Sequence, residues 1–116
     1  MATRARFGIR NVNGTITSVY HHWDGYPDWL LVKLRADYNT EDKIREVMKD
    51  GDMSCIAAAR DWNHNEIPKR PLYYKERGEN CPPVTNSQYS FWELCHDCGA
   101  EFAYVFENGE WSQFSL

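Results

Sequence analysis

Two short clusters of the chain contain side chains able to carry chemistry. The first is the block Tyr20-His21-His22-Trp23-Asp24-Gly25-Tyr26-Pro27, in which aromatic rings and polar groups are interleaved. The rings of Trp23 and Tyr26 can stack on a base or nucleotide, while His22 and Asp24 can bond to its polar edges. These four residues are therefore candidates for binding a ligand or a partner. In the alternative interpretation, the two rings only pack the junction between two elements and Asp24 caps a turn.

Arginines near the start of the chain extend this candidate site. Arg4, Arg6 and Arg10 share one strand parity, so their side chains are expected on one face of a sheet. Opposite the aromatic block, Arg4 and Arg6 could receive a phosphate or a carboxylate. The alternative is a charged strand that discourages pairing with another chain. By the same parity rule, His21 and His22 point to opposite faces and are not expected to share a metal.

The second cluster is Cys95-His96-Asp97-Cys98-Gly99. A Cys-x-x-Cys pair before a strand is typical of a zinc knuckle, in which two thiolates chelate the metal from one tight turn. Cys95 and Cys98 are thus candidate zinc ligands. A full site needs two more, for which Cys81, Cys55, His96 and His64 are available, and Cys81 is the candidate among them. The chain holds no second Cys-x-x-Cys, so two incidental thiols near a turn are the alternative.

Recognised catalytic motifs do not accompany these clusters. The sequence contains no Walker loop, no dinucleotide-binding glycine pattern and no Gly-x-Ser-x-Gly elbow. This favours a binding protein over an enzyme. A metal-dependent hydrolase, or a zinc-binding interaction module, remains an alternative because of the cysteine cluster.

Two predicted β-hairpins must position the clusters. Residues 5–22 alternate apolar and polar side chains around the turn Asn11-Val12-Asn13-Gly14, and residues 100–114 do so around Glu107-Asn108-Gly109-Glu110. An Asn-Gly pair between two alternating runs is a strong hairpin signal. The aromatic block then lies where the first hairpin ends.

Helical patterns follow the first hairpin. Pro27 suits the first turn of a helix that runs to about Tyr38, and Thr40 is a suitable N-cap for a second helix over 41–49. The two apolar stripes are expected to cover one face of the sheet. The prediction is an α+β fold, with an antiparallel sheet of four to five strands made by the two hairpins and with two helices packed on one face. The other face is expected to stay open as a binding platform.

The pattern weakens over residues 52–89. A short helical turn is predicted for Met53–Arg60, a brief strand for Pro71–Lys75, and a loop for Glu76–Pro83. Long irregular stretches within a small domain are often functional or mobile.

Length and composition predict one domain over residues 1–116. Hydrophobic residues make up 42% of the chain and charged residues 26%, as is usual for globular proteins. The net charge of -4 argues against a broad nucleic-acid-binding surface. No apolar run is long enough for a signal peptide or a membrane span, so a cytoplasmic protein with reduced cysteines is expected.

Two motifs and several shorter segments carry a family resemblance. The motifs are Thr3-Arg4-Ala5-Arg6-Phe7-Gly8-Ile9 and His22-Trp23-Asp24-Gly25-Tyr26-Pro27, and weaker likeness continues to residues 104–111. On these residues the chain resembles a family of short uncharacterised proteins encoded by bacteriophages, prophages and plasmids. The resemblance implies an accessory protein made in the cytoplasm of an infected bacterium, and it supplies no catalytic residues.

The function expected from these observations is binding. The leading hypothesis is a small non-enzymatic phage accessory protein that binds and modulates a host bacterial protein, such as a component of a defence system. The alternative is a protein that binds or sequesters a small nucleotide signal through the aromatic block and the arginines. A homodimer formed through an exposed strand edge is a further expectation.

Overall fold

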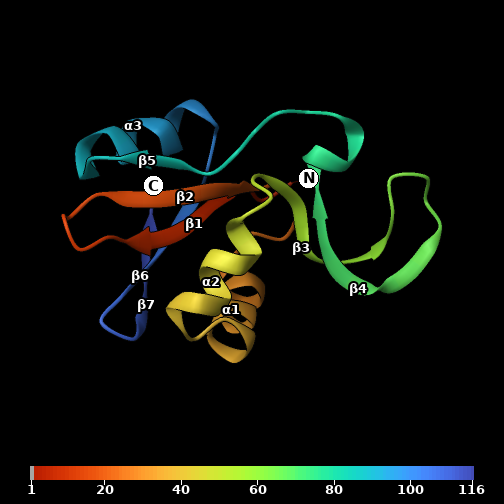
Figure 1. Cartoon of the computed structure of the whole chain (residues 1–116), viewed down its shortest axis with the longest axis horizontal. Coiled ribbons are helices and arrows are strands. Elements are labelled where there is room, and N and C mark those ends of the chain that lie inside the picture. The colour runs from red at the N-terminus through yellow and green to blue at the C-terminus, as the bar shows by residue number, and fades with distance from the viewer. Residues whose placement is uncertain (1) are drawn as a thin grey trace.

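The computed structural model describes residues 2–116 and contains one mixed β-sheet with helices on both faces (Figure 1). The strands lie in the order β4-β3-β2-β1-β6-β7, and β5 pairs separately with β2. The strand bounds are β1 Ala5–Arg10, β2 Ile16–His21, β3 Met53–Arg60, β4 Glu66–Tyr73, β5 Val84–Asn86, β6 Phe102–Glu107 and β7 Glu110–Ser115. The helical elements are η1 Pro27–Leu31, α1 Val32–Asp37, α2 Glu41–Met48, η2 Tyr74–Arg77 and α3 Gln88–Asp97. Among residues 2–116, no helix has both the length and the apolar character needed to cross a bilayer.

Both predicted hairpins are confirmed. β1 pairs antiparallel with β2, and β6 pairs antiparallel with β7. In the second hairpin, Asn108 and Gly109 have φ angles of 53° and 80°. Positive φ at both central residues is the turn geometry whose twist matches that of paired strands.

The predicted antiparallel sheet of four to five strands is only partly correct, because the seven-stranded sheet is mixed. β1 and β6 run parallel, with Phe7 beside Tyr104, and this pairing joins the two hairpins side by side. β2 and β3 also meet in parallel at His21 and Met53. The segment between β2 and β3 contains α1 and α2, and helical crossovers of this kind are what parallel neighbours require.

One face of the sheet is covered by α1 and α2, as predicted. Phe7 and Tyr104 from the sheet and Leu34 and Ile44 from the helices are fully buried in the same apolar cluster. Thr40 caps α2, since its hydroxyl accepts a bond from the Lys43 amide at 3.3 Å. This cap fixes the start of α2 at the position that the sequence indicates.

The opposite face is not open, and the prediction of helices on one face alone is wrong. α3 packs there, placing Phe91 and Cys95 against Ile16, Ala103 and Val105 in a second buried cluster. These sheet residues alternate with the ones that face α1 and α2, so both faces are apolar and both require cover.

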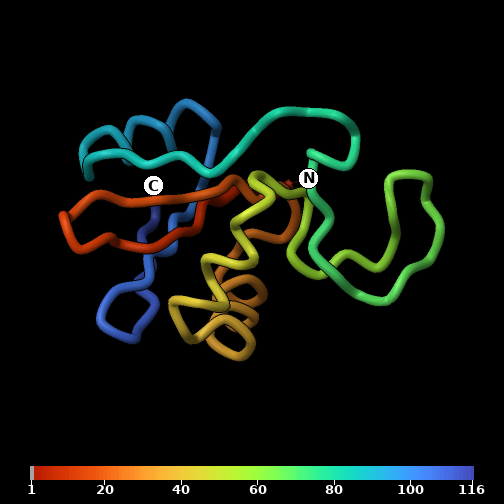
Figure 2. Tube along the Cα trace, in the orientation of Figure 1, coloured from red at the N-terminus to blue at the C-terminus, as the bar shows by residue number. Residues whose placement is uncertain are grey.

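β3 and β4 form an arm that extends from the sheet, and its tip turns back (Figure 2). The predicted helical turn over Met53–Arg60 is wrong, because this segment is the strand β3. Three register irregularities interrupt its pairing with β4, which explains the lack of regular alternation in the sequence. At the tip, Trp62 donates from Nε1 to the Tyr73 carbonyl at 3.0 Å, and Arg77 lies 4.2 Å from the centre of the Trp62 ring.

Candidate functional site

Part of the sequence-predicted site forms a patch beside the C-terminal end of α3. The Tyr20 hydroxyl and His22 Nδ1 are hydrogen bonded at 2.7 Å, and the Trp23 ring meets the His22 ring edge-on at 4.7 Å between centroids. Burial and then the charge of Arg4 lower the pKa of His22. Arg4 also lies against Gly99, since a Cβ added there would be 2.9 Å from Arg4 Nη1. We call Arg4, Tyr20, His22 and Trp23 the Arg4 patch.

The two adjacent histidines lie on opposite faces, as their parity predicts. His21 is fully buried on the α1 side, where its Nε2 accepts a bond from the Ile56 amide at 2.9 Å. Its Nδ1 has no partner among the described residues. Burial lowers the pKa of His21 to about 3, so the ring is neutral and belongs to the core.

Arg6 is buried and is not part of the exposed Arg4 patch. Its side chain is only 4% exposed and donates to Ser18 Oγ at 3.0 Å and to the Ser18 carbonyl at 3.2 Å. Among residues 2–116, no carboxylate lies in ion-pair range of Arg6. Arg6 therefore anchors β1 to β2 beneath α3.

The end of the aromatic block is arranged around Gly25. Its amide donates to the Thr3 carbonyl at 2.8 Å, and its carbonyl accepts from the Tyr104 hydroxyl at 2.7 Å. A Cβ here would lie 2.6 Å from the Thr3 oxygen, so the position requires glycine. The flanking Asp24 and Tyr26 are exposed. Burial raises the pKa of the Cys55 thiol on β3, and the charge of Asp24 raises it further.

The cysteine pair belongs to the last turn of α3 rather than to a knuckle between strands. Cys95 is fully buried, and burial raises the pKa of its thiol to about 12. Cys98 donates from Sγ to the Cys95 carbonyl at 3.4 Å. Across residues 2–116 there is no group of three or more His, Cys, Asp and Glu side chains placed to hold a metal ion. Cys81 lies apart, in the loop that follows η2, and zinc binding by these cysteines stays a prediction.

Three adjoining surface depressions lie elsewhere, between α2, β4 and the η2–β5 loop. Three hollows of about 270, 470 and 500 Å³ share Asp50 on their linings. We call them together the α2–β4 groove. Its lining residues are Tyr38, Asp42, Lys43, Glu46, Val47, Lys49, Asp50, Arg70, Pro71, Tyr73, Lys75, Glu76, Gly78, Glu79, Asn80, Cys81 and Pro82.

The floor of the α2–β4 groove is held in place by Tyr73. Its hydroxyl donates to the Val47 carbonyl at 2.6 Å, which ties β4 to α2. Burial, with a further contribution from Asp50, raises the pKa of Tyr73, so the hydroxyl stays protonated and keeps this bond. The ring is thus a fixed aromatic surface between Val47 and Pro71.

One end of the groove is closed by the loop after η2. Gly51 has a φ of 89°, and a Cβ there would lie 2.1 Å from the Cys81 carbonyl oxygen. The same oxygen accepts from the Asp52 amide at 3.0 Å. Only glycine at position 51 allows the loop to approach the end of α2 this closely.

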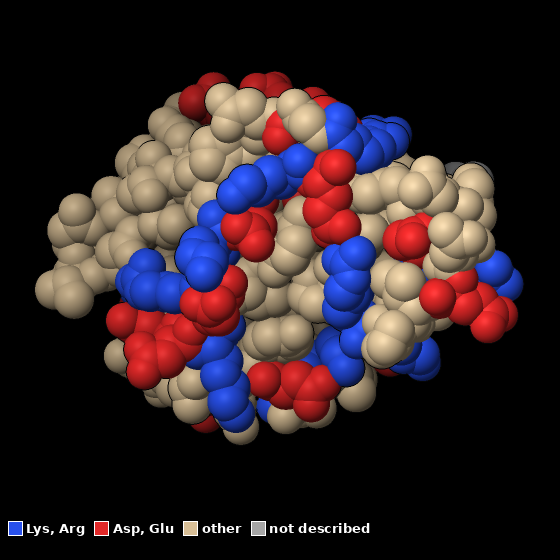
Figure 3. All heavy atoms as spheres, turned by 45° about the vertical axis from the view of Figure 1, so that its right-hand side comes forward, with Lys and Arg blue, Asp and Glu red and all other residues tan. Residues whose placement is uncertain are grey.

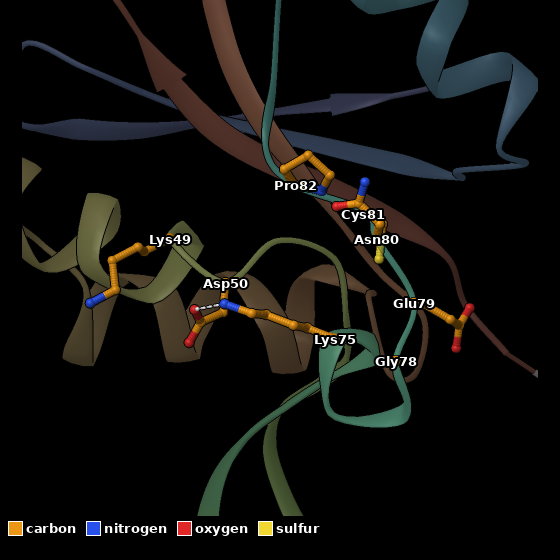
Figure 4. A pocket seen from close by; sticks show the side chains of 8 residues that line it. All are labelled: Lys49, Asp50, Lys75, Gly78, Glu79, Asn80, Cys81 and Pro82. Atoms are coloured by element: carbon orange, nitrogen blue, oxygen red, sulfur yellow. Dashed lines mark hydrogen bonds and ion pairs between the residues drawn. The ribbon is translucent and has the colours of Figure 1, made fainter.

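Charges of both signs form the rim. Lys75 Nζ meets Asp50 Oδ1 at 3.3 Å, while Glu79 points away from this pair (Figure 4). Arg70 binds both carboxylate oxygens of Glu76 at 2.9 Å. Seen from the side of the arm, basic and acidic side chains are interleaved with uncharged atoms between them (Figure 3). The rim is therefore polar without a strong excess of either charge.

Comparison of the chain with protein-family models, curated proteins and solved structures gives no match. The site is accordingly argued from geometry. Sequence patterns did not indicate the α2–β4 groove, because its walls come from three separate segments and its central ring, Tyr73, lies in a stretch without periodicity. Pro71 and Tyr73 were the one available signal, a rigid and an aromatic residue in the first half of the predicted strand Pro71–Lys75.

Proposed function

We propose that this chain is a small binding protein whose α2–β4 groove receives a segment of a partner protein. The observation that carries the proposal is the fixed Tyr73 ring, which lines two adjoining hollows that share Asp50 with a third, and which has paired charges around it. Protein interfaces combine aromatic and arginine side chains at their centre with a polar rim. A surface that is already rigid loses less conformational entropy on binding.

The rim charges favour a protein segment over a phosphate-bearing ligand in this groove. Arg70 and Lys75 are bound to Glu76 and Asp50, and Lys49 is paired with Glu46 at 3.2 Å. Among the described residues, Lys43 is the one cation of the groove without a carboxylate in ion-pair range, whereas a phosphate is held best by several free cations. A polypeptide with one apolar anchor and charges of both signs matches the uncharged floor and the mixed rim.

A bacterial host protein is the partner expected for this function. The resemblance to phage-encoded accessory proteins supports it, and the cytoplasm of the infected cell is then the place of action. The bound protein would modulate a host process if the segment in the groove is one that the host protein needs for its own function. We expect the protein to form a stoichiometric complex with its partner and not to catalyse a reaction on it.

Photocrosslinking from within the groove tests the proposal. A benzoylphenylalanine replaces Lys43, an exposed residue on the groove wall, or Arg35, an exposed residue of α1 that does not line the groove. We expect one host protein to be crosslinked from position 43 and not from position 35. Equal capture at both positions, or none at position 43, would contradict the proposal.

A matched pair of charge reversals then measures the contribution of the groove. With the purified crosslinked partner, Lys43→Glu should weaken binding about 10-fold in calorimetry, as expected for one rim charge. Arg35→Glu introduces the same change in charge outside the groove and should bind as the original protein does. Equal weakening by both variants would assign the effect to net charge alone.

The Arg4 patch supports a second candidate function, the binding of an anionic nucleotide. Within the described residues, Arg4 has no carboxylate in ion-pair range, and the neighbouring Trp23 side chain is 46% exposed. A free guanidinium beside an exposed indole can bind a phosphate and stack a base.

Calorimetry with nucleoside mono-, di- and triphosphates decides this second candidate. Binding should be lost in both Arg4→Ala and Trp23→Ala and retained in Arg35→Ala. If no nucleotide releases or absorbs heat at millimolar concentration, the Arg4 patch has a structural role only.

A further inference from the structure

β4 and β7, the strands at the two ends of the order β4-β3-β2-β1-β6-β7, differ in how they are protected against pairing with another strand. β4, at one edge, contains Pro68 and Pro71 together with the charged Lys69 and Arg70. Prolines and positive charges are the usual means by which an edge strand is kept from pairing. β7, at the other edge, has the sequence Glu-Trp-Ser-Gln-Phe-Ser and contains none of these features.

The free backbone groups of β7 can be assigned from its pairing with β6. The Leu116 amide donates to the Glu101 carbonyl at 3.0 Å, so this position points toward β6. In an antiparallel pair, alternate residues point their N–H and C=O groups to the neighbour and the others point them away. The outward groups therefore belong to Trp111, Gln113 and Ser115, and among the described strands β7 has no partner other than β6.

Apolar surface continues beside this free edge on the α3 side. A hollow of about 370 Å³ is lined by Trp92, His96, Phe114, Ser115 and Leu116. Leu116 is 38% exposed. A strand added to β7 would extend the sheet and cover the apolar groups nearest to the edge.

We propose that β7 pairs antiparallel with β7 of a second copy of this chain, around a two-fold axis at Gln113. In this register Trp111 lies opposite Ser115 of the partner subunit, and Phe114 lies opposite Ser112 of the partner subunit. Each bulky residue thus meets a small one, and Gln113 meets its own symmetry mate. Glu110 lies opposite Leu116 of the partner subunit, so no two strand carboxylates face each other.

This complementarity is the reason for assigning the edge to a second copy rather than to an unrelated strand. Around a two-fold axis, β7 pairs with an identical strand that runs in the opposite direction. Each large residue on one side of Gln113 must therefore be matched by a small residue equally far on the other side. About six backbone hydrogen bonds would form across the pair, two for each outward-facing residue. The result is one sheet that continues through both copies, with no free β7 edge.

Light scattering coupled to size exclusion tests the dimer. The original protein should show twice the 13.6 kDa chain mass at micromolar concentration. Gln113→Pro removes an outward N–H at the axis and should raise the dissociation constant roughly 100-fold. Gln113→Ala keeps that N–H and should remain dimeric. A chain that stays monomeric to 1 mM, or a dimer unaffected by Gln113→Pro, overturns the proposal.

Disulfide trapping gives a second readout that does not depend on the folding of the proline variant. In the proposed register the two Cα atoms of residue 113 are about 5.5 Å apart, within the range of a disulfide. Gln113→Cys should therefore crosslink two copies under mild oxidation through position 113, as identified by peptide mass. Ser112→Cys, which lies opposite Phe114 of the partner subunit, should crosslink far less. Equal crosslinking by both variants contradicts the register.

Discussion

The sheet body and the β3–β4 arm both contain antiparallel strand pairs, yet different interactions hold them. In the body, which comprises β2, β1, β6 and β7 with α1, α2 and α3, both faces are filled by buried apolar residues. In the arm, most side chains from Ala57 to Arg70 are exposed or half-buried. Its tip is held by the Trp62 bond to Tyr73 and by the stacking of Arg77 on Trp62.

This difference indicates where the molecule can change without losing its fold. Regions with few buried apolar contacts open locally at low cost, whereas a filled core opens only with global unfolding. The α2–β4 groove lies at the boundary of the two regions, because its floor residue Tyr73 is the last residue of β4 and is bonded to α2. The proposed binding surface thus joins a rigid wall to a more adaptable one.

The largest effect is expected from a cavity in the body. Phe7→Ala removes a fully buried ring that packs against Trp111, and it should lower the free energy of unfolding by about 3–5 kcal/mol. Urea unfolding followed by tryptophan fluorescence measures this loss. A loss below about 1 kcal/mol would show that the body is not the main source of stability.

Acid should destabilise the body through His21. The folded ring has a pKa of about 3 and the unfolded one about 6.5, so below pH 6.5 the unfolded chain binds the extra proton. Stability is therefore complete above pH 6.5 and falls as the pH drops toward 3. Between pH 7 and 5 the loss should be about 2 kcal/mol.

Urea titrations at several pH values measure the contribution of His21. His21→Leu should flatten the dependence over this range, even though it lowers stability at every pH. His22→Asn should keep most of the slope, because His22 is only half-buried. An unchanged slope in His21→Leu would assign the acid sensitivity to another group.

The arm should respond locally to loss of its tip contact. Trp62→Ala removes the bond to Tyr73 and the stacking with Arg77, and it should cost about 1 kcal/mol. Hydrogen exchange in residues 57–70 should rise at least five-fold, while exchange in β1 and β6 stays as it was. If exchange rises equally in all strands, the arm and the body unfold as one unit.

The smallest effect is expected from the bidentate pair in the arm. Arg70→Lys keeps the charge but loses the two parallel bonds to Glu76, and it should change stability by less than about 1 kcal/mol. The amide of Tyr73, which donates to Glu76 at 2.9 Å, should exchange faster in this variant. If Arg70→Lys lowered the free energy of unfolding as much as Phe7→Ala does, the arm would not be the less stable region.

Local sequence signals were sufficient to predict the turns, caps and helices that depend on interactions between residues close together in the chain. The two Asn-Gly turns, the Thr40 cap and the apolar stripe of α2 each depend on neighbours within a few residues, and each is found where the sequence indicates. The parallel pairing of β1 with β6 was not predicted, since it depends on contacts between opposite ends of the chain. The segment Met53–Arg60 was predicted as a helical turn and is the strand β3. Ala57, Ala58 and Ala59 in it favour helix, and pairing with β4 overrides that preference.

α3 was missed for a related reason. Its stripe of Phe91 and Cys95 is short, and the Cys-x-x-Cys spacing was interpreted as chemistry rather than as two positions on one helix. The candidate site shows the same limit. His22 and Trp23 are neighbours in the chain and remain neighbours in the Arg4 patch, whereas the α2–β4 groove is assembled by tertiary contacts that no local pattern encodes.

The parallel pairing of β1 with β6 has a consequence for how the protein is made. The N-terminal hairpin leaves the ribosome early, but β1 obtains its second neighbour only when residues 102–107 have been synthesised. Until then, Phe7 and Ile9 lack the Tyr104 and Phe106 side of their packing. The nascent chain therefore carries an incomplete core until residues 102–107 have been made, and the body is expected to fold in one late, cooperative step.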